Sequence, residues 1–171
     1  MKKLSLILLS LLMLSALISC QNESNLPALS EMTERDEKIF LTGLSATNQL
    51  IVKYQNNIPV NGEISDYFDY STKTLTYTLS NCSTTVDLSS DNLGIVEVSY
   101  LDGNVSYKVS DINFMFPCTV SILASFNMEG DTHVFYSKIQ LNDFTDMKYI
   151  SLKIDGVSYD VSEINKILGN N

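Results

Sequence analysis

The stretch 74-TLTYTLS-80 is the clearest secondary-structure signal in the chain and decides the fold class. Leu75, Tyr77 and Leu79 alternate with hydroxyl residues, so one face of the segment is apolar and the other is polar. A period of two residues is that of a β-strand with one buried face. The alternation continues through residues 82–88. The stretch therefore predicts a long strand in an all-β protein.

Three hairpins are predicted after this strand, each centred on a glycine. The first joins 95–101 to 105–109 through Asp102-Gly103, the second joins 119–128 to 132–141 through Glu129-Gly130-Asp131, and the third joins 149–154 to 157–161 through Asp155-Gly156. Asp-Gly tolerates the positive φ angles of a type I′ turn. With a further strand expected at residues 50–55, the total of about nine strands predicts an antiparallel β-sandwich or barrel.

Short helices are expected at both ends of this domain. Thr33-Glu34-Arg35-Asp36 has the [ST]-x-x-[DE] form of a capping box, and Gly43 offers a stop, so a helix is predicted at about 34–42. At the other end, Ser162 caps a final short helix that ends at Gly169.

Residues 102–113 are echoed by residues 155–165. When Asn104 is omitted, nine of the eleven aligned positions are identical. The echo is explained either by an internal duplication of hairpin units near 95–113 and 149–165, or by the residue preferences that all such hairpins share. Duplication predicts positive φ angles at both Gly103 and Gly156, with a bulged or three-residue turn at the first site and a tight turn at the second.

The chain begins like a secretory signal. Lys2 and Lys3 precede an apolar run at residues 4–18 that only three serines interrupt, and polar residues follow Cys20. A positive segment followed by an apolar run of this length is the layout of a signal peptide. A transmembrane helix would need about 20 apolar residues, and an ordinary signal peptide would leave Cys20 as an odd thiol in an oxidising compartment.

Leu17-Ile18-Ser19-Cys20 resembles the lipobox of bacterial lipoproteins. The resemblance implies that Cys20 is acylated, that residues 1–19 are removed, and that Cys20 becomes the membrane anchor of an exported protein in the cell membrane or outer membrane, facing the periplasm or the exterior. Gln21 stands where the family's inner-membrane class has Asp, which favours the outer membrane. Residues 20–30 are then a tether, and residues 31–171 form a single β domain.

The charge balance excludes some partners. The 171 residues carry a formal net charge of −9, which becomes more negative when Lys2 and Lys3 are removed with the leader. Such an acidic chain is expected to have no electrostatic footprint for nucleic acid and no polybasic patch for anionic lipid headgroups. We therefore expect the membrane contact to be the acyl group alone.

Two cysteines remain after the anchor. In an exported protein an even pair predicts a disulfide, so Cys82 and Cys118 are expected to be bridged. The alternative is two buried thiols. Their spacing fits no zinc pattern.

The residues offer little catalytic chemistry. His133 is the single histidine, expected as a polar residue on a strand face, and the chain has no G-x-S-x-G, P-loop, G-x-G-x-x-G or H-E-x-x-H motif. Acidic side chains could supply a carboxylate pair for glycoside hydrolysis or oxygen ligands for calcium, but turn chemistry explains them better. The calcium candidates are Asp91, Asn92, Asp102, Asn104 and Asp131. No catalytic, cofactor or metal site is predicted.

Two aromatic clusters could serve either as core or as contact surface: Tyr67-Phe68-Asp69-Tyr70 and Phe114-Met115-Phe116-Pro117. The leading functional hypothesis is a lipid-anchored envelope lipoprotein with a non-catalytic β domain that binds another component. The alternatives are a small β-barrel carrier of an apolar ligand and a carboxylate-dependent hydrolase.

Overall fold

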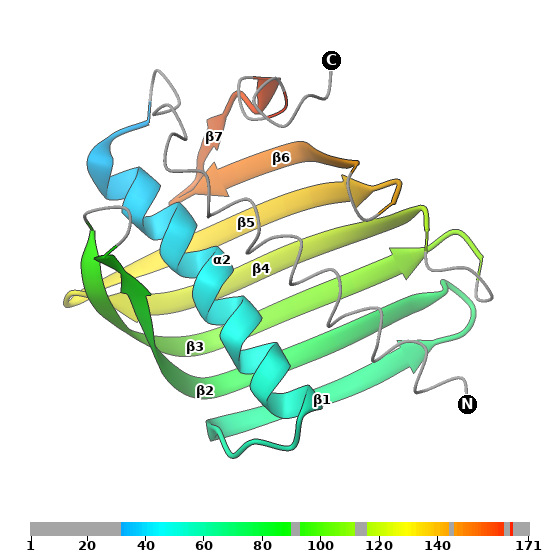
Figure 1. The fold of residues 1–171 in the computed structure, drawn as a ribbon, viewed down its shortest axis with the longest axis horizontal. Coiled ribbons are helices and arrows are strands. Elements are labelled where there is room, and N and C mark those ends of the chain that lie inside the picture. The colour runs from blue at the N-terminus through cyan, green and yellow to red at the C-terminus, as the bar shows by residue number, and fades with distance from the viewer. Residues whose placement is uncertain (1–31, 90–92, 112–115, 144–145, 163–164, 166–171) are drawn as a thin grey trace.

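The computed structural model describes residues 32–89, 93–111, 116–143, 146–162 and 165. In this part of the chain a helix is followed by one antiparallel sheet whose strands lie in chain order (Figure 1). The elements are α2 (Glu34–Gln55), β1 (Asn61–Asp69), β2 (Thr74–Leu88), β3 (Gly94–Val109), β4 (Cys118–Met128), β5 (Asp131–Leu141), β6 (Met147–Ile154) and β7 (Val157–Tyr159).

The mostly β character and the antiparallel pairing are as predicted, and two of the three hairpins are confirmed. β4 and β5 are joined by Glu129-Gly130, and β6 and β7 by Asp155-Gly156. Both residues of each turn have positive φ, as in a type I′ turn. The described strands form one open sheet, without a second sheet facing it and without pairing between β1 and β7.

The predicted turn at Asp102-Gly103 is wrong, because β3 runs through it without interruption. Gly103 pairs with Leu79 of β2 and Ala124 of β4, and its φ is not positive. A Cβ at Gly103 would lie 3.2 Å from the Tyr100 ring, so the glycine makes room for that side chain. The two copies of the echo therefore lack the structural equivalence that duplication predicted.

The helix is longer than predicted, and the strand expected at residues 50–55 is its C-terminal part. Leu50 and Ile51 are consecutive and both fully buried, which a half-exposed strand does not allow. Gly43 does not end the helix. It lies against the ring of Phe135, and a Cβ there would come within 3.0 Å of ring atoms. The glycine lets α2 approach β5 closely.

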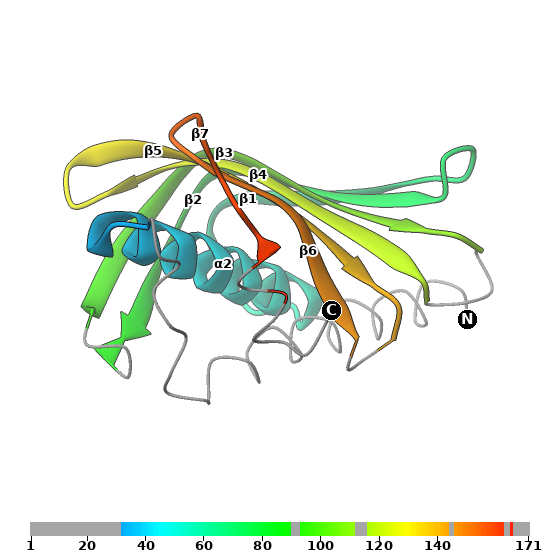
Figure 2. The same ribbon diagram turned by 90° about the horizontal axis from the view of Figure 1, so that it is seen from above.

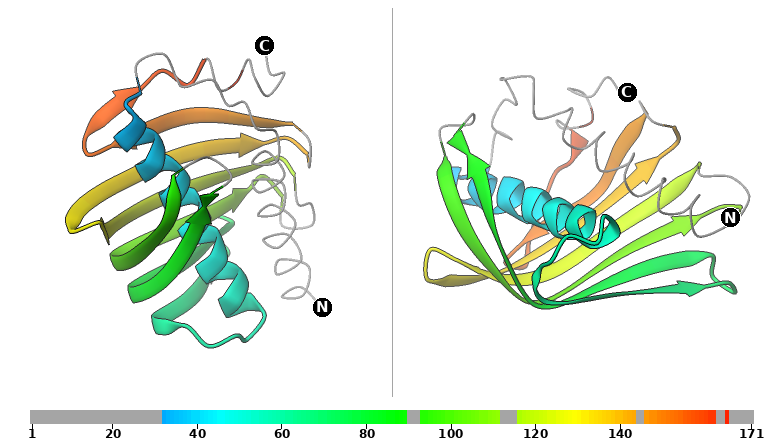
Figure 3. Two further views of the ribbon diagram at one scale, coloured as in Figure 1. Left: turned by 60° about the vertical axis from the view of Figure 1, so that its left-hand side comes forward. Right: turned by 60° about the horizontal axis from the view of Figure 1, so that its bottom comes forward.

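The sheet bends along a line that crosses its first three strands. The pairing register shifts between Asn61 and Glu63 in β1 and between Tyr100 and Asp102 in β3, and Asn81 in β2 has a φ of 50°. The register places these irregularities side by side. Because bulges increase local twist and bending, the strands curve around α2, which lies in the concavity (Figures 2 and 3).

The core lies between α2 and the concave face of the sheet. The helix contributes Ile39, Phe40, Leu50 and Ile51, all at most 7% exposed. Phe40 packs at 6.2 Å on the ring of Phe135 in β5. The predicted C-terminal helix lies largely outside the described residues.

Candidate functional site

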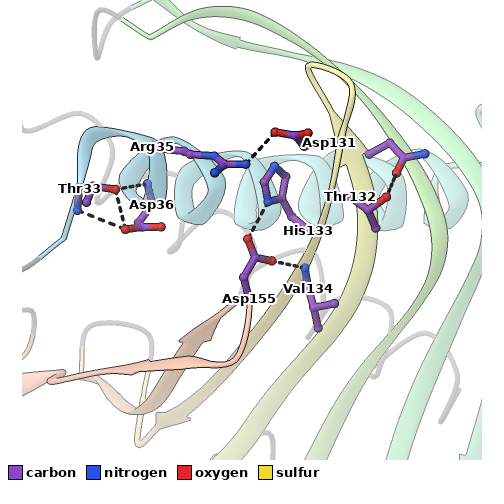
Figure 4. Close-up of polar contacts among 9 residues, drawn as sticks. Thr33, Arg35, Asp36, Asp131, Thr132, His133, Val134 and Asp155 are labelled. Carbon is purple, nitrogen blue, oxygen red and sulfur yellow. Dashed lines mark hydrogen bonds and ion pairs between the residues drawn. The ribbon is translucent and has the colours of Figure 1, made fainter.

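A polar cluster lies where the first turn of α2 meets the β4–β5 turn and the β6–β7 turn (Figure 4). The cluster contains the side chains of Arg35, Asp36, Asp131, His133 and Asp155. Three segments that are distant in sequence are joined here, which makes the cluster the first candidate for a functional site.

The helix start follows the predicted capping box. The Thr33 hydroxyl accepts a hydrogen bond from the Asp36 amide, and the Asp36 side chain accepts one from the Thr33 amide. Two backbone donors that would lack helical partners are thereby satisfied. The cap fixes the direction in which Arg35 and Lys38 leave the helix.

Two ion pairs connect this turn to the β4–β5 hairpin. Arg35 Nη2 lies 2.7 Å from Asp131 Oδ2, and Lys38 Nζ pairs with Glu129. The Arg35 and Asp131 side chains are 61% and 67% exposed, and exposed pairs are worth only about 0–1 kcal/mol. These pairs orient the hairpin more than they stabilise it.

His133 is buried, contrary to the expectation of an ordinary polar residue on a strand face. It does lie on β5, but on the concave side, where it is 1% exposed. Its Nδ1 lies 2.8 Å from Asp155 Oδ2, and Asp155 Oδ1 accepts a hydrogen bond from the Val134 amide. The Asp155 amide in turn donates to the Val134 carbonyl oxygen. Through its side chain and its amide, Asp155 therefore holds the β6–β7 turn against β5.

The electrostatics of the cluster follow from these bonds. Burial by itself would raise the pKa of Asp155, but hydrogen bonds from His133 and the Val134 amide outweigh it, and the net pKa is lowered. Burial and the nearby Asp36 carboxylate raise the pKa of Tyr159 to about 12. Asp155 is thus held as a carboxylate and Tyr159 as a neutral phenol at neutral pH.

The His133–Asp155 pair resembles two members of a catalytic triad, but its surroundings do not suit nucleophilic catalysis. A triad needs an exposed nucleophile beside the histidine. The neighbouring Thr132 hydroxyl donates to Asn127 instead, and the histidine side chain is only 2% exposed. The geometry fits a structural connection between the β6–β7 turn and β5.

A second group of polar contacts lies beneath α2. The Tyr100 hydroxyl is 2.6 Å from the Thr47 hydroxyl and donates to the Gly43 carbonyl oxygen at 3.3 Å. Burial raises the pKa of Tyr100 well above its usual value. Near the end of the helix, Gln55 donates to the Tyr77 hydroxyl at 2.8 Å. These contacts connect the helix to β2 and β3.

The predicted disulfide is wrong: Cys82 and Cys118 are separate buried thiols. Cys82 lies on β2 and Cys118 on β4, so β3 separates them. The thiol of Cys82 donates to the Glu63 carbonyl oxygen at 3.3 Å. The two cysteines are also far apart along the strand direction. Cys118 pairs with Val109 of β3, whereas Cys82 lies across from the part of β3 near Tyr100, where the sheet bends. A disulfide requires Cα atoms within about 7 Å, which this placement excludes.

The other predicted positions are distributed as follows. Cys20 and residues 114–115 lie outside the described residues. Tyr67 and Tyr70 are 70% and 71% exposed at the end of β1, whereas Phe68 is half-buried and packs on the Tyr70 ring. The first aromatic cluster thus offers two tyrosines to solvent.

The calcium candidates are not brought together in the described part. Asp91 and Asn92 lie outside it, Asp102 and Asn104 lie on β3, and Asp131 is bound to Arg35. No group of three or more histidine, cysteine or acidic residues with metal-binding geometry occurs among the described residues.

Comparison with known proteins gives no match to any family model, curated protein or solved structure. The described region is a seven-stranded antiparallel meander curved around α2. Within that region, no helix is long and apolar enough to cross a membrane.

Proposed function

We propose that this protein is a lipid-anchored lipoprotein of the bacterial cell envelope, whose β domain acts without catalysis as an interaction module. The observation that carries the proposal is the sequence of the first 20 residues. Lys2 and Lys3, the apolar run at 4–18 and the lipobox-like Leu17-Ile18-Ser19-Cys20 occur in the order that lipoprotein processing requires.

The start of the domain is compatible with this anchor. α2 begins at Glu34, so residues 21–33 connect Cys20 to the start of α2. At about 3.3–3.6 Å per residue, this segment can extend to roughly 45 Å. This length would allow the domain to reach the surface of the bilayer that holds the acyl group.

The organisation of the domain supports a binding role better than the alternatives. A carrier would need space within the concavity of the sheet. α2 occupies that concavity, with Phe40 packed against Phe135 and Tyr149 at centroid distances of 6.2 and 6.0 Å. A carboxylate hydrolase would need two acids at an open cleft. In the polar cluster, Asp131 and Asp155 are instead engaged by Arg35 and His133.

The test is the chemistry of the mature N-terminus. The full chain, expressed in a bacterial host, should yield a membrane-bound protein that begins at Cys20 and has the mass of an acylated cysteine. A Cys20→Ser chain should incorporate no labelled palmitate.

Cys82→Ser is the matched control, because it removes another thiol and should keep the label. A mature chain that begins at a different residue, or one without acyl mass, would show that the anchor proposal is wrong.

A further inference from the structure

The face of the sheet that points away from α2 carries a group of lysines on β3 to β6, although acids such as Glu97 and Asp102 lie elsewhere on the same face. Figure 2 shows α2 on the concave side, which leaves the convex face without a covering element among the described ones. We call one part of this face the lysine face. It consists of Lys108, Lys138, Lys148 and Lys153 with the side chains of Leu123, Val134, Tyr136 and Ile150.

The strand register places these lysines in three adjacent rows. One row runs Thr74, Lys108, Thr119, Gln140, Lys148; the next runs Thr76, Ser106, Ser121, Lys138, Ser151; the third runs Thr78, Asn104, Leu123, Tyr136, Lys153. Residues paired across antiparallel strands point to the same face. From β2 to β6, these three rows contain lysines and neutral residues but no carboxylate, whereas the next row, which holds Val134, also holds Asp102.

The lysines are available for contact. Lys108, Lys148 and Lys153 are exposed and Lys138 is half-buried. None of the four forms an ion pair with an acid among the described residues. In a chain with a formal net charge of −9, four unpaired lysines on one face form a local positive surface.

Aliphatic side chains lie among these charges. Leu123, Val134 and Ile150 are 49%, 46% and 44% exposed on β4, β5 and β6. Ile150 is turned outward at a register shift between β5 and β6. Tyr136 is half-buried between Leu123 and Lys153. Lysines mixed with aliphatic and aromatic side chains are typical of surfaces that lie in the interface of an anionic membrane.

We propose that the lysine face rests on an anionic phospholipid surface and thereby sets the orientation of the domain. This inference rests on the proposed Cys20 anchor. The attraction between one lysine and an anionic bilayer is small and is screened by salt. A tether makes the contact intramolecular, so a weak surface is sufficient once the acyl chains hold the protein on the bilayer.

The shape of the face favours a membrane over an acidic protein. Protein interfaces concentrate their binding energy in a few central residues that fit pockets. Here the charges are distributed over several strands, between serine and threonine side chains, on a convex surface. The negative charge of an anionic membrane is spread over many lipid headgroups and therefore matches this distribution of lysines. The acidic first turn of α2, with Glu34, Asp36 and Glu37, lies on the helix side and would face away from the lipid.

The experiment uses the acylated full-length mature protein, purified in detergent and reconstituted into vesicles. One set contains phosphatidylcholine alone, and the other contains phosphatidylcholine with phosphatidylglycerol. Each lysine is acetylated with an amine reagent, and its rate is followed by mass spectrometry. We expect acetylation of Lys138, Lys148 and Lys153 to be about fivefold slower on the anionic vesicles. Lys53, at the end of α2, should be unchanged.

The protection should disappear at about 1 M salt, where the Debye length falls to about 3 Å. A Lys138→Glu/Lys148→Glu/Lys153→Glu chain should lose the protection of Lys108, whereas Lys53→Glu should keep it. Equal rates on both vesicles, in a sample whose Cys20 is acylated, would overturn the lysine face and leave the anchor intact. A sample without acyl mass would overturn both. Protection in native envelope membranes but not on anionic vesicles would overturn the membrane contact in favour of an acidic protein.

Discussion

Nδ1 of His133 lies 2.8 Å from Oδ2 of Asp155, although the two residues are 22 positions apart and the histidine side chain is only 2% exposed. Asp155 occupies the first position of the β6–β7 turn with a φ of 50°. One residue therefore combines two tasks. Its backbone makes the tight turn, and its carboxylate satisfies the buried imidazole and the Val134 amide.

Replacing Asp155 should separate these two tasks. Asp155→Asn keeps a residue that tolerates positive φ, but it loses the charge that favours the hydrogen bonds. We expect a loss of about 1–2 kcal/mol in the free energy of unfolding at pH 7. Asp155→Ala should cost more, because it also places an ordinary side chain at positive φ. Urea unfolding measures both changes.

The pH dependence gives an independent check. The pKa of Asp155 is lowered in the folded protein, so its stabilising effect is complete above the unfolded-state pKa of about 4 and is lost as the pH falls through the folded-state value. The stability difference between the wild type and Asp155→Asn should therefore shrink in acid. A difference that is constant from neutral pH to well below pH 4 would contradict the role assigned to the carboxylate.

The two buried cysteines should titrate as thiols. Thiol reagent added to the unfolded mature protein without reductant should find two reactive groups, and the folded protein should react slowly. Burial raises the pKa of Cys118 to about 12, so its reactive thiolate is scarce at neutral pH. A titration that finds no thiol would restore the disulfide and would require a different placement of β2 and β4, which β3 separates in the sheet.

Some of the fold was readable from local sequence, and some depended on distant partners. The hairpins at Gly130 and Gly156 have two flanking strands of clear alternation, and they form as predicted. Asp102-Gly103 has the same local signals, but the ring of Tyr100 needs the space above Gly103. Nothing within the hairpin motif indicates this packing.

The length of α2 and the bulge in β2 also had signals in the sequence, but these signals were open to a different interpretation. The buried residues of α2 include positions 39, 40, 43, 46, 47, 50 and 51, which recur at a helical spacing, so the short alternation at residues 50–54 was misleading. In β2 the apolar positions change from odd numbers to even numbers between Leu79 and Cys82. That change of phase marks the bulge at Asn81. The His133–Asp155 contact had no such signal, because it depends on the β5–β6 pairing.

Asn165 should hold the C-terminal segment against β6. Its side chain accepts a hydrogen bond from the Tyr149 amide at 2.7 Å and donates one to the Tyr149 carbonyl oxygen at 2.8 Å. Asn165→Ala should leave both buried backbone groups without these partners and cost about 1–3 kcal/mol. Asn165→Asp keeps an acceptor but loses the donor, so it should also be destabilising. Amide hydrogen exchange at Tyr149 should accelerate in both variants, and unchanged exchange would contradict the contact.

Among the glycines along the bend of the sheet, Gly62 should lose the most stability when it is replaced. It has a φ of +93°, and a Cβ at this position would clash with the Asn81 carbonyl oxygen and lie 2.7 Å from the Cys82 Cα. Gly130 is the matched control, because it has the same φ of +93° but a Cβ there would meet no atom within 4 Å. Gly130→Ala should therefore lower the free energy of unfolding only by the cost of placing alanine at positive φ, which is about 1–2 kcal/mol. Gly62→Ala must in addition push β1 away from β2. We expect Gly62→Ala to cost at least about twice as much in urea unfolding, since backbone atoms cannot rotate aside as a side chain does. Equal losses in the two variants would show that β1 does not approach β2 this closely at the bend.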